Sequence, residues 1–308
     1  MKEQNRIWIS VDGGGTKTEL CACDSSGKKV YDEFFGRSNY KTAGRDTVKN
    51  TLTLAFREMM EALGIQMEHV AGIVLAIAGC DSRQDKKVYT EMMLSAGIPE
   101  EKLFICNDTE VIFRALSDED GVCVVAGTGS IVCAYNKIEM FARVGGWGPP
   151  LSDMGSGYWI GTEILRRMVR WLDGMEEQKL PVFQKIEERF ARPDVELSWV
   201  LAGLTVTEMA SVSSLVFEYA GQGDEVCRKI IHQAAQLLVE QITALCRKAG
   251  FLKRIPIVTV GGLFSDENFC RKVEDGVQRA LKEKEISFLK PVGSPAEDGL
   301  HYARKLFP

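Results

Sequence analysis

The sequence predicts an α/β protein in which one βββαβαβα unit occurs twice along 308 residues. The first observation behind this prediction is a glycine-rich turn after the first apolar strand, Asp12-Gly13-Gly14-Gly15-Thr16-Lys17-Thr18. The second is a similar turn, Gly127-Thr128-Gly129-Ser130, which follows the apolar run 122–126. In both places the next residues alternate as another strand would, so each turn is expected to close a β-hairpin.

These turns differ from the common phosphate-binding loops. The first turn lacks the third glycine of a dinucleotide fingerprint and leads back into a strand, and the P-loop pattern G-x-x-x-x-G-K-[ST] is absent from the chain. Glycine still permits positive φ and lets backbone N–H groups approach phosphate oxygens. One such turn could be a plain hairpin. Two of them suggest two halves that face each other across the phosphates of a nucleotide.

Hydrophobic periodicity defines the elements of the first half in order. Strands are expected near 6–12, 18–24 and 28–36, then a helix over 45–63, a strand at 72–76, a helix over 84–96, a strand at 103–106 and a helix over 109–117. A polar, acidic break at 117–120 marks the best domain boundary. The expected domains are therefore 1–117 and 118–308.

The same pattern restarts after this boundary, with a longer helical part. The expected elements are strands near 121–127, 131–136 and 139–144, helices over 156–173, 179–191, 206–220 and 224–249, a strand at 255–260, a helix near 266–283, a strand at 287–289 and a helix over 295–306. The last helix could pack back toward the first domain. A duplicated α/β unit of this kind is expected to bind its ligand between the copies.

The composition excludes several classes of function. A hydrophobic content of 45% and a charged content of 26% are typical of a globular protein. The net charge of −5, without a long basic run, argues against a nucleic-acid or anionic-membrane surface. No apolar run is long enough for a transmembrane helix, and the first strand begins too early for a signal peptide. We therefore expect a cytoplasmic protein without nucleic-acid or membrane partners.

Nine cysteines are scattered along the chain without a C-x-x-C pair. Most of them fall in predicted strands or helices, where a reduced cysteine behaves as a small buried hydrophobe. Cys21 and Cys23 would point to one face of a strand, which leaves a metal-ligand pair open.

Five segments in a fixed order resemble a known group of proteins: DGGGTKT, NDT at 107–109, AGTGS, GGWGPPLSDMGSGYWIG at 145–161, and TVGGLF. They are similar to segments of the actin/hexokinase/Hsp70 ATPase superfamily. Within it, the chain most resembles the BadF/BadG/BcrA/BcrD ATPase family and its N-acetylglucosamine kinase branch, from about residue 7 to 303. The resemblance implies two ribonuclease-H-like (actin-like ATPase) domains with the active site in the cleft between them.

The resemblance also implies ATP and Mg²⁺ as cofactors. It assigns the metal to Asp12, since Mg²⁺ is usually held by one or two carboxylates together with phosphates. The implied nucleotide-binding residues are Asp12, Gly13, Gly14, Gly15, Thr16, Lys17, Gly127, Thr128, Gly129, Ser130, Gly261 and Gly262. Lys17 is equally compatible with a solvated surface position, and Gly261-Gly262 with a plain strand-to-helix turn.

Asp108 matches the aspartate that similar sugar kinases use as the base for the attacking hydroxyl. Asp is also a favoured helix N-cap, so a purely structural role stays open. The implied substrate-binding residues are Asn39, Asp108, Gly146, Trp147, Gly148 and Asp153. Asn39 could instead be a turn residue, Asp153 a helix cap and Trp147 part of the core. Ile131 stands where the kinase branch often has Asn, which puts one polar contact in doubt.

The predicted function is phosphorylation of an amino sugar at its 6-hydroxyl, with N-acetylglucosamine first and glucosamine or N-acetylmuramic acid as alternatives. A different chemistry in the same family is the ATPase that activates 2-hydroxyacyl-CoA dehydratases or benzoyl-CoA reductases through a [4Fe–4S] cluster. That role is disfavoured because no paired cysteine follows Cys133 before Cys227. ROK-type kinases are disfavoured because their C-x-C-G-x-x-G-C motif is absent. A non-catalytic sugar sensor is disfavoured because it would lack the catalytic base or the glycine-rich turns, and this sequence retains both. A homodimer fits the resemblance, and the sequence leaves the oligomeric state open.

Overall fold

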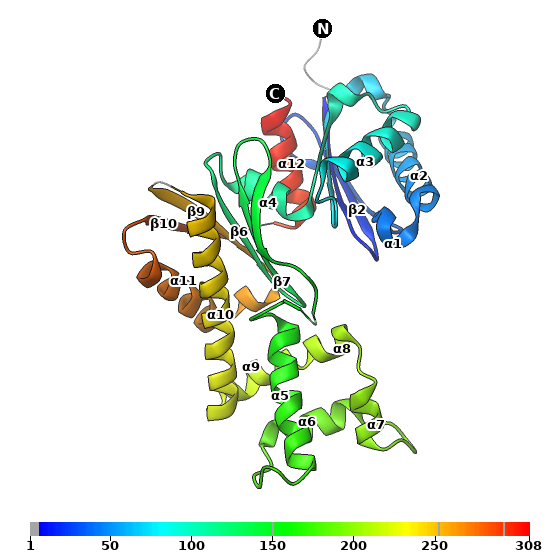
Figure 1. Ribbon diagram of the computed structural model, residues 1–308. Coiled ribbons are helices and arrows are strands. Elements are labelled where there is room, and N and C mark those ends of the chain that lie inside the picture. The colour runs from blue at the N-terminus through cyan, green and yellow to red at the C-terminus, as the bar shows by residue number, and fades with distance from the viewer. Residues whose placement is uncertain (1–5, 150, 252, 292) are drawn as a thin grey trace. The chain divides into compact units, whose positions relative to one another are not determined.

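The computed structural model describes residues 6–149, 151–251, 253–291 and 293–308. The chain divides into two compact units: Met1–Asp118 with Lys290–Pro308 form unit 1, and Glu119–Leu289 form unit 2. Each unit contains one five-stranded sheet flanked by helices (Figure 1).

Unit 1 contains the elements of the first half together with the last helix of the chain. They are β1 (Ile7–Gly13), β2 (Thr18–Cys23), β3 (Lys29–Phe35), α1 (Tyr40–Ala43), α2 (Arg45–Leu63), η2 (Met67–His69), β4 (Val70–Ile77), α3 (Arg83–Ser95), η3 (Glu100–Lys102), β5 (Leu103–Cys106), α4 (Asp108–Leu116) and α12 (Pro295–Leu306). Every strand and long helix expected in this half is present. The short helix α1 was not expected, because four residues leave too little periodicity to detect.

Unit 2 begins with the second set of three strands and continues with a long helical part. Its elements are β6 (Gly121–Ala126), β7 (Ser130–Tyr135), β8 (Met140–Gly145), α5 (Gly157–Leu172), α6 (Pro181–Phe190), α7 (Leu197–Ala202), α8 (Val206–Ser211), α9 (Ser213–Gly221), α10 (Glu225–Ala249), β9 (Arg254–Val260), η4 (Gly262–Ser265), α11 (Glu267–Ala280) and β10 (Glu285–Leu289).

The two sheets have the same topology. The strand order is β3-β2-β1-β4-β5 in unit 1 and β8-β7-β6-β9-β10 in unit 2. In each sheet the first three strands are antiparallel, and the two later strands add parallel to the first. This repetition confirms the predicted duplicated α/β fold.

The sheet of unit 1 is covered on both faces. Ile9 and Val11 point into a core with Leu52 and Phe56 of α2, and α3 contributes Tyr89 to the same core. On the other face α12 packs on β1, β2 and β4 (Figure 1). There the Trp8 indole donates a hydrogen bond of 2.8 Å to the Phe307 carbonyl. The first glycine-rich turn therefore projects from the end of a well-packed sheet.

The position of α12 decides where the units end. The sequence assigned 118–308 to the second domain and allowed the last helix to pack back. In the structure, unit 2 ends at Leu289 and Lys290–Pro308 belong to unit 1. The physical reason is that α12 buries Ala296, Leu300 and Ala303 while it packs on β1, β4 and α4.

The helix expected over 206–220 is split into α8 and α9 at Val212. Serine hydroxyls compete for the carbonyls at this break: Ser213 Oγ donates to Ala210 O at 2.7 Å, and Ser211 Oγ donates to Glu208 O at 2.7 Å. Such back-bonding bends helices, and a periodicity argument does not detect it. The additional helix α7 precedes this region.

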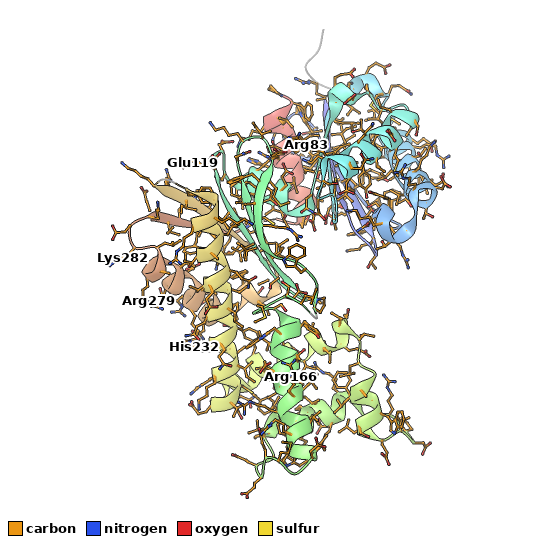
Figure 2. All side chains as sticks on the ribbon, in the orientation of Figure 1. Arg83, Glu119, Arg166, His232, Arg279 and Lys282 are labelled. Carbon is orange, nitrogen blue, oxygen red and sulfur yellow. The ribbon has the colours of Figure 1, made fainter. Side chains whose placement is uncertain are left out.

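The outer faces of the helices in unit 2 carry exposed charged and polar side chains. Examples are Arg166 on α5, His232 on α10 and Arg279 on α11 (Figure 2). None of the described helices has both the length and the apolarity that a membrane span requires.

Candidate active site

The first glycine-rich turn connects β1 to β2 and contacts the segment after β3. Gly14 N–H donates to Lys17 O at 3.0 Å, which closes the hairpin. Gly14 O accepts hydrogen bonds from the backbone N–H groups of Ser38 at 3.0 Å and Asn39 at 3.2 Å. A β-carbon on Gly13 would overlap the Ser38 side chain, so only glycine fits there. The structure therefore brings the turn and Asn39 together.

Asp12 lies in a group of carboxylates at the end of β1. It pairs with Glu19 across the hairpin. Burial, together with the negative charges of Asp108 and Glu19, raises the pKa of Asp12 to about 6, although the charge of Lys17 opposes this shift. The Lys17 ammonium lies 4.1 Å from the centre of the Phe34 ring. A cation beside Asp12 would offset this repulsion, so the donor set fits the Mg²⁺ that the resemblance implies.

Asp108 is the first residue of α4, but the cap of that helix is its neighbour. The Asn107 side-chain oxygen accepts a hydrogen bond of 2.9 Å from Thr109 N–H. Asn107 Nδ2 also donates to Asp81 Oδ1 at 2.7 Å. Burial raises the pKa of Asp108, bonds from Thr109 N–H and its own N–H oppose this, and the charge of Asp81 adds to it. Because Asn107 caps the helix, the capping alternative for Asp108 loses its main support.

Asn39 has a structural role of its own. It caps α1, where its Oδ1 accepts from Lys41 N–H at 3.0 Å, and its Nδ2 donates to Ala78 O at 2.9 Å. An amide can make further bonds through its second N–H and its second oxygen lone pair. Asn39 is therefore a fixed side chain that retains hydrogen-bonding capacity.

The second glycine-rich turn is held by the start of α5. Gly127 N–H donates to Gly129 O at 2.9 Å. Two helical N–H groups then donate to the turn, Gly157 to Gly127 O at 2.8 Å and Tyr158 to Thr128 O at 3.0 Å. The turn is thus backed by a helix N-terminus, whose dipole favours negative charge nearby.

Asp153 is buried beside this turn in an unusual backbone conformation. Its φ is 57°, and its side chain is 7% exposed. Burial raises the pKa of Asp153, and a hydrogen bond from Ser130 N–H partly offsets that effect. Ser156 caps α5, so Asp153 is not the cap of this helix. Ser130 Oγ donates its proton to Met154 O at 2.9 Å, so this hydroxyl is already engaged.

The segment 145–148 presents Trp147 at the surface. Trp147 is 68% exposed, so it is not part of the core, and the Arg143 guanidinium lies 4.4 Å from its ring centre. A β-carbon on Gly146 would stand 2.5 Å from Ile131 Cδ1, so Ile131 packs beneath this segment. Gly148 has open space around its Cβ position. The neighbouring position 150 lies outside the described residues.

Gly261 and Gly262 lie next to the second turn. Gly261 has a φ of 109°, and a β-carbon there would overlap the backbone of Ala126, the last residue of β6. Nothing lies within 4 Å of the Cβ positions of Gly262 and Gly127. The structure therefore brings Gly261-Gly262 and the turn 127–130 together on unit 2, with open space beside Gly262 and Gly127.

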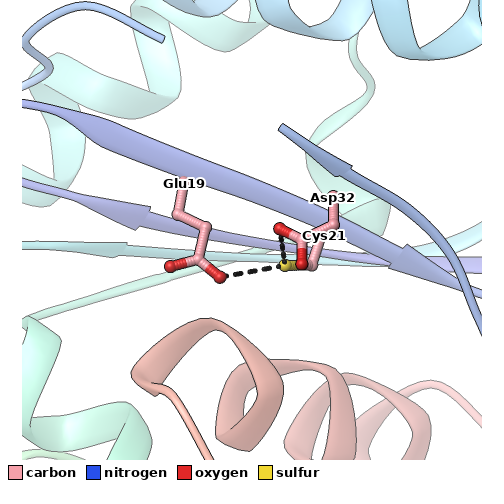
Figure 3. A group of neighbouring side chains, drawn as sticks. All are labelled: Glu19, Cys21 and Asp32. Atoms are coloured by element: carbon pink, nitrogen blue, oxygen red, sulfur yellow. Dashed lines mark hydrogen bonds between the residues drawn. The ribbon is translucent and has the colours of Figure 1, made fainter. Parts of the chain in front are cut away.

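A hydrogen-bonded group lies on β2 and β3 (Figure 3). The Cys21 thiol lies 3.3 Å from Glu19 Oε1 and 3.2 Å from Asp32 Oδ1, between which it shares its proton. Burial raises the pKa of Cys21, and the bonds to both carboxylates raise it further, so it stays a thiol. Lys29 forms an ion pair of 2.7 Å with Asp32. Cys23 is not a member of this group, in which the neighbours of Cys21 are the two carboxylates.

Three supporting residues were missed by the sequence argument. Asn107 and Ser156 cap the two helices behind the candidate aspartates. Asp85 binds Tyr40, which follows Asn39, and the backbone of Asp81, whose carboxylate accepts a hydrogen bond from Asn107. The spacing of Ser82 and Asp85, three residues apart before a helix, is a capping-box pattern that could have identified the last of these.

Known proteins are similar to this chain over most of its length. An N-acetyl-D-glucosamine kinase from Dictyostelium discoideum is 32% identical over 274 residues, which cover 83% of this chain and 85% of that protein. An N-acetylmuramic acid/N-acetylglucosamine kinase from Clostridium acetobutylicum is 29% identical over 265 residues, which cover 85% and 86%.

Solved structures show the same fold. A Chromobacterium violaceum protein, described provisionally as an N-acetylglucosamine kinase, has a TM-score of 0.66 and 20% identity, covering 97% of this chain and 99% of its own. The fold is thus the two-domain fold of actin-like ATPases that the sequence predicts. The model of the BadF/BadG/BcrA/BcrD ATPase family matches residues 9–291, so the resemblance is confirmed and the chain belongs to this family.

Proposed function

We propose that this protein is an ATP-dependent kinase that transfers the γ-phosphoryl group to the 6-hydroxyl of N-acetylglucosamine. The observation that carries the proposal is a half-buried Asp108 carboxylate whose negative charge acts on Asp12, at the start of a helix that Asn107 caps in its place. The names of the two relatives support an amino sugar as the acceptor. N-acetylmuramic acid and glucosamine are the alternatives.

In the proposed reaction, Asp108 accepts the proton of the sugar hydroxyl as that oxygen attacks the γ-phosphorus. Phosphoryl transfer needs little covalent chemistry from the protein beyond positioning and charge neutralisation. A raised pKa makes the ionised carboxylate a stronger proton acceptor, and burial of Asp108 has this effect. The pKa of the proposed base is therefore raised by burial and by neighbouring charge, without a histidine partner.

The nucleotide would bind through backbone groups of both turns. We assign the phosphates to their N–H groups and to the hydroxyls of Thr16 and Thr128, and the adenosine side to the open backbone of Gly262. Asp12 would hold Mg²⁺, which when bound supplies charge neutralisation at the phosphates. The Lys17 ammonium would add positive charge near the first turn.

The sugar would bind through side chains that are already fixed. Asn39 has a free hydrogen-bonding position on each polar side-chain atom, and the buried Asp153 carboxylate accepts a hydrogen bond from Ser130 N–H. We assign both to hydroxyls of the acceptor. Trp147, which lies between Gly146 and Gly148 in the chain, is exposed and would cover the sugar.

The buried cysteines favour the kinase over the dehydratase-activating ATPase. A [4Fe–4S] cluster shared between two subunits needs thiols at the surface, whereas all nine cysteines are buried and none forms a disulfide. Reduced thiols also fit a reducing compartment, so we expect the protein to work in the cytoplasm. A homodimer, which is common among the proteins that the sequence resembles, is the assembly to test by sedimentation.

The decisive experiment is an ADP-release assay with N-acetylglucosamine, N-acetylmuramic acid, glucosamine, glucose and no sugar. We expect kcat/KM to be highest for N-acetylglucosamine and the product to carry phosphate at the 6-position in NMR spectra. ADP release that does not depend on any of these sugars would overturn the proposal. A higher kcat/KM for another amino sugar would leave the kinase activity in place and change only the assignment of the preferred substrate.

A further inference from the structure

The carboxylate of Asp85 receives five hydrogen bonds at the start of α3. Its Oδ1 accepts from Tyr40 Oη at 2.6 Å. Its Oδ2 accepts from Lys41 Nζ at 3.0 Å, from Ser82 Oγ at 2.7 Å, and from the N–H groups of Ser82 at 3.0 Å and Asp81 at 3.1 Å. Asp85 is only 4% exposed. Burial raises its pKa, but the bonds from Tyr40, Ser82 and Lys41 lower it below the usual value, so Asp85 stays ionised.

The first segment that Asp85 fixes contains Asn39. Tyr40 and Lys41 follow Asn39 directly, and Lys41 N–H is the donor to Asn39 Oδ1. The Tyr40 ring packs edge-on against Tyr89, with centres 5.5 Å apart, and Tyr89 Oη donates to Ser38 O at 2.8 Å. The two bonds from Tyr40 and Lys41 to Asp85 therefore hold the backbone on which Asn39 is mounted.

The second segment leads to Asp108. Asp85 binds the backbone of Asp81, and Asp81 Oδ1 accepts the 2.7 Å bond from Asn107, the residue before Asp108. Lys41 reinforces this link, since its Nζ also donates to Gly79 O at 2.6 Å. One buried carboxylate thus connects the support of Asn39 to the support of Asp108, and neither connection involves atoms assigned to a ligand.

We propose that Asp85 is a positioning residue that sets the distance between Asn39, which would hold the sugar, and Asp108, which would accept its proton. This inference rests on the proposed function. A sugar hydroxyl must be held within hydrogen-bond reach of its base, and small displacements reduce the rate steeply. A single anion that binds both supports keeps them in one geometry before the sugar arrives.

The test is the Asp85→Asn variant, which keeps the shape of the side chain and removes its charge. The amide nitrogen can face Tyr40 Oη, whose hydroxyl can turn to accept it, so the variant is expected to fold. We expect KM for N-acetylglucosamine to rise about tenfold or more, because a charged hydrogen-bond acceptor is lost. The Kd of ATP, measured without sugar, should stay within about twofold, because none of the five donors to Asp85 belongs to the turn 12–18 and the bonds from Ser38 N–H and Asn39 N–H to Gly14 O do not involve Asp85.

A raised KM for the sugar together with an unchanged Kd for ATP distinguishes a positioning role from a general structural defect. A defect in folding would lower the active fraction, and kcat with it, at unchanged KM. Unchanged KM for the sugar in Asp85→Asn would overturn the inference. The matched control is Glu91→Gln, which removes the charge of an exposed side chain on the same helix and should change neither constant.

Tyr40→Phe provides a second, milder variant that retains the ring packing on Tyr89. It removes one bond to Asp85, so we expect KM for the sugar to rise about threefold, and the double variant to be less than additive. If Asp85→Asn does not fold, an unchanged KM in Tyr40→Phe overturns the inference by itself. A wild-type protein that phosphorylates no sugar would overturn the proposed function, which is a distinguishable result.

Discussion

Asp153 lies directly against Gly129: a β-carbon built on the glycine would stand 2.7 Å from Asp153 Oδ2. This contact joins the aspartate assigned to the sugar with the turn assigned to the phosphates, both on unit 2. The backbone of Asp153 is held at a φ of 57°, and its carboxylate binds Ser130 N–H. A change at either residue should therefore affect both ligands.

Gly129→Ala is expected to weaken sugar and ATP binding together. The new methyl group would displace the Asp153 carboxylate, and loss of its hydrogen bonds to the sugar should raise KM about tenfold or more. Titration calorimetry with each ligand alone measures the two effects. Sugar affinity that is unchanged in this variant would contradict the assignment of Asp153.

Gly127→Ala separates the two effects. Nothing lies within 4 Å of the Cβ position of Gly127, so its methyl group meets no protein atom. If phosphates lie over this backbone, ATP affinity should fall while KM for the sugar changes little. Gly221→Ala, which also has open space, is the control for the substitution itself. Unchanged ATP affinity in Gly127→Ala would contradict the assignment of the phosphates to this turn.

Asp108→Asn should abolish most phosphoryl transfer without unfolding the protein. A general base is commonly worth about 10²–10⁴-fold in rate, and the asparagine cannot accept the proton. Because Asn107 caps α4, the free energy of unfolding should not fall. The measurements are kcat in the ADP-release assay and chemical denaturation. A variant that keeps more than about a tenth of the wild-type kcat would rule out Asp108 as the base.

Asp298 makes the stability of unit 1 depend on pH. Burial raises its pKa from 3.8 to about 6, with a further contribution from Glu297. Its Oδ2 has no hydrogen-bond partner among the described residues. Because the folded-state pKa is raised, the contribution of Asp298 to stability is fully present below about pH 4 and is lost as the pH rises through about 6.

Asp298→Asn, which cannot ionise, should therefore stabilise the protein at neutral pH. We expect the free energy of unfolding to rise by about 1–3 kcal/mol near pH 7.5 and to change little near pH 4. Denaturant titrations at both pH values measure this, with the exposed Asp275→Asn on α11 as the control. An equal effect at both pH values would show that ionisation of Asp298 is not the cause.

Gly261→Ala should damage the adenosine side of the proposed site. The glycine has a φ of 109°, and its Cβ position overlaps the backbone of Ala126. Gly250, with a φ of 69° and open space around it, provides the comparison. Gly250→Ala should cost about 1–2 kcal/mol from backbone strain alone. Gly261→Ala should cost more and also lower ATP affinity, as thermal shifts with and without ATP would reveal. Equal losses of stability in both variants would exclude the overlap as a cause.

The sequence by itself determined most of the elements and the two turns. Alternation in segments such as Ile7–Gly13 and Gly121–Ala126, each followed by glycines, depends on neighbours along the chain, so periodicity and turn chemistry reveal it. The same local signals located Asp12, Asn39 and the second turn at ends of strands. Even the duplication follows from them, because the two halves repeat the same order of elements.

Tertiary structure decided what lies beside each of these residues. The return of α12 to unit 1 depends on which sheet its buried face fits, and nothing in its own periodicity identifies that sheet. The choice of Asn107 and Ser156 as caps depends on backbone angles at the helix starts. The five bonds to Asp85 and the contact of Gly129 with Asp153 join residues from separate segments. Such contacts are set by packing and burial over long chain separations, which is why the sequence could identify the candidate residues but not the network that holds them.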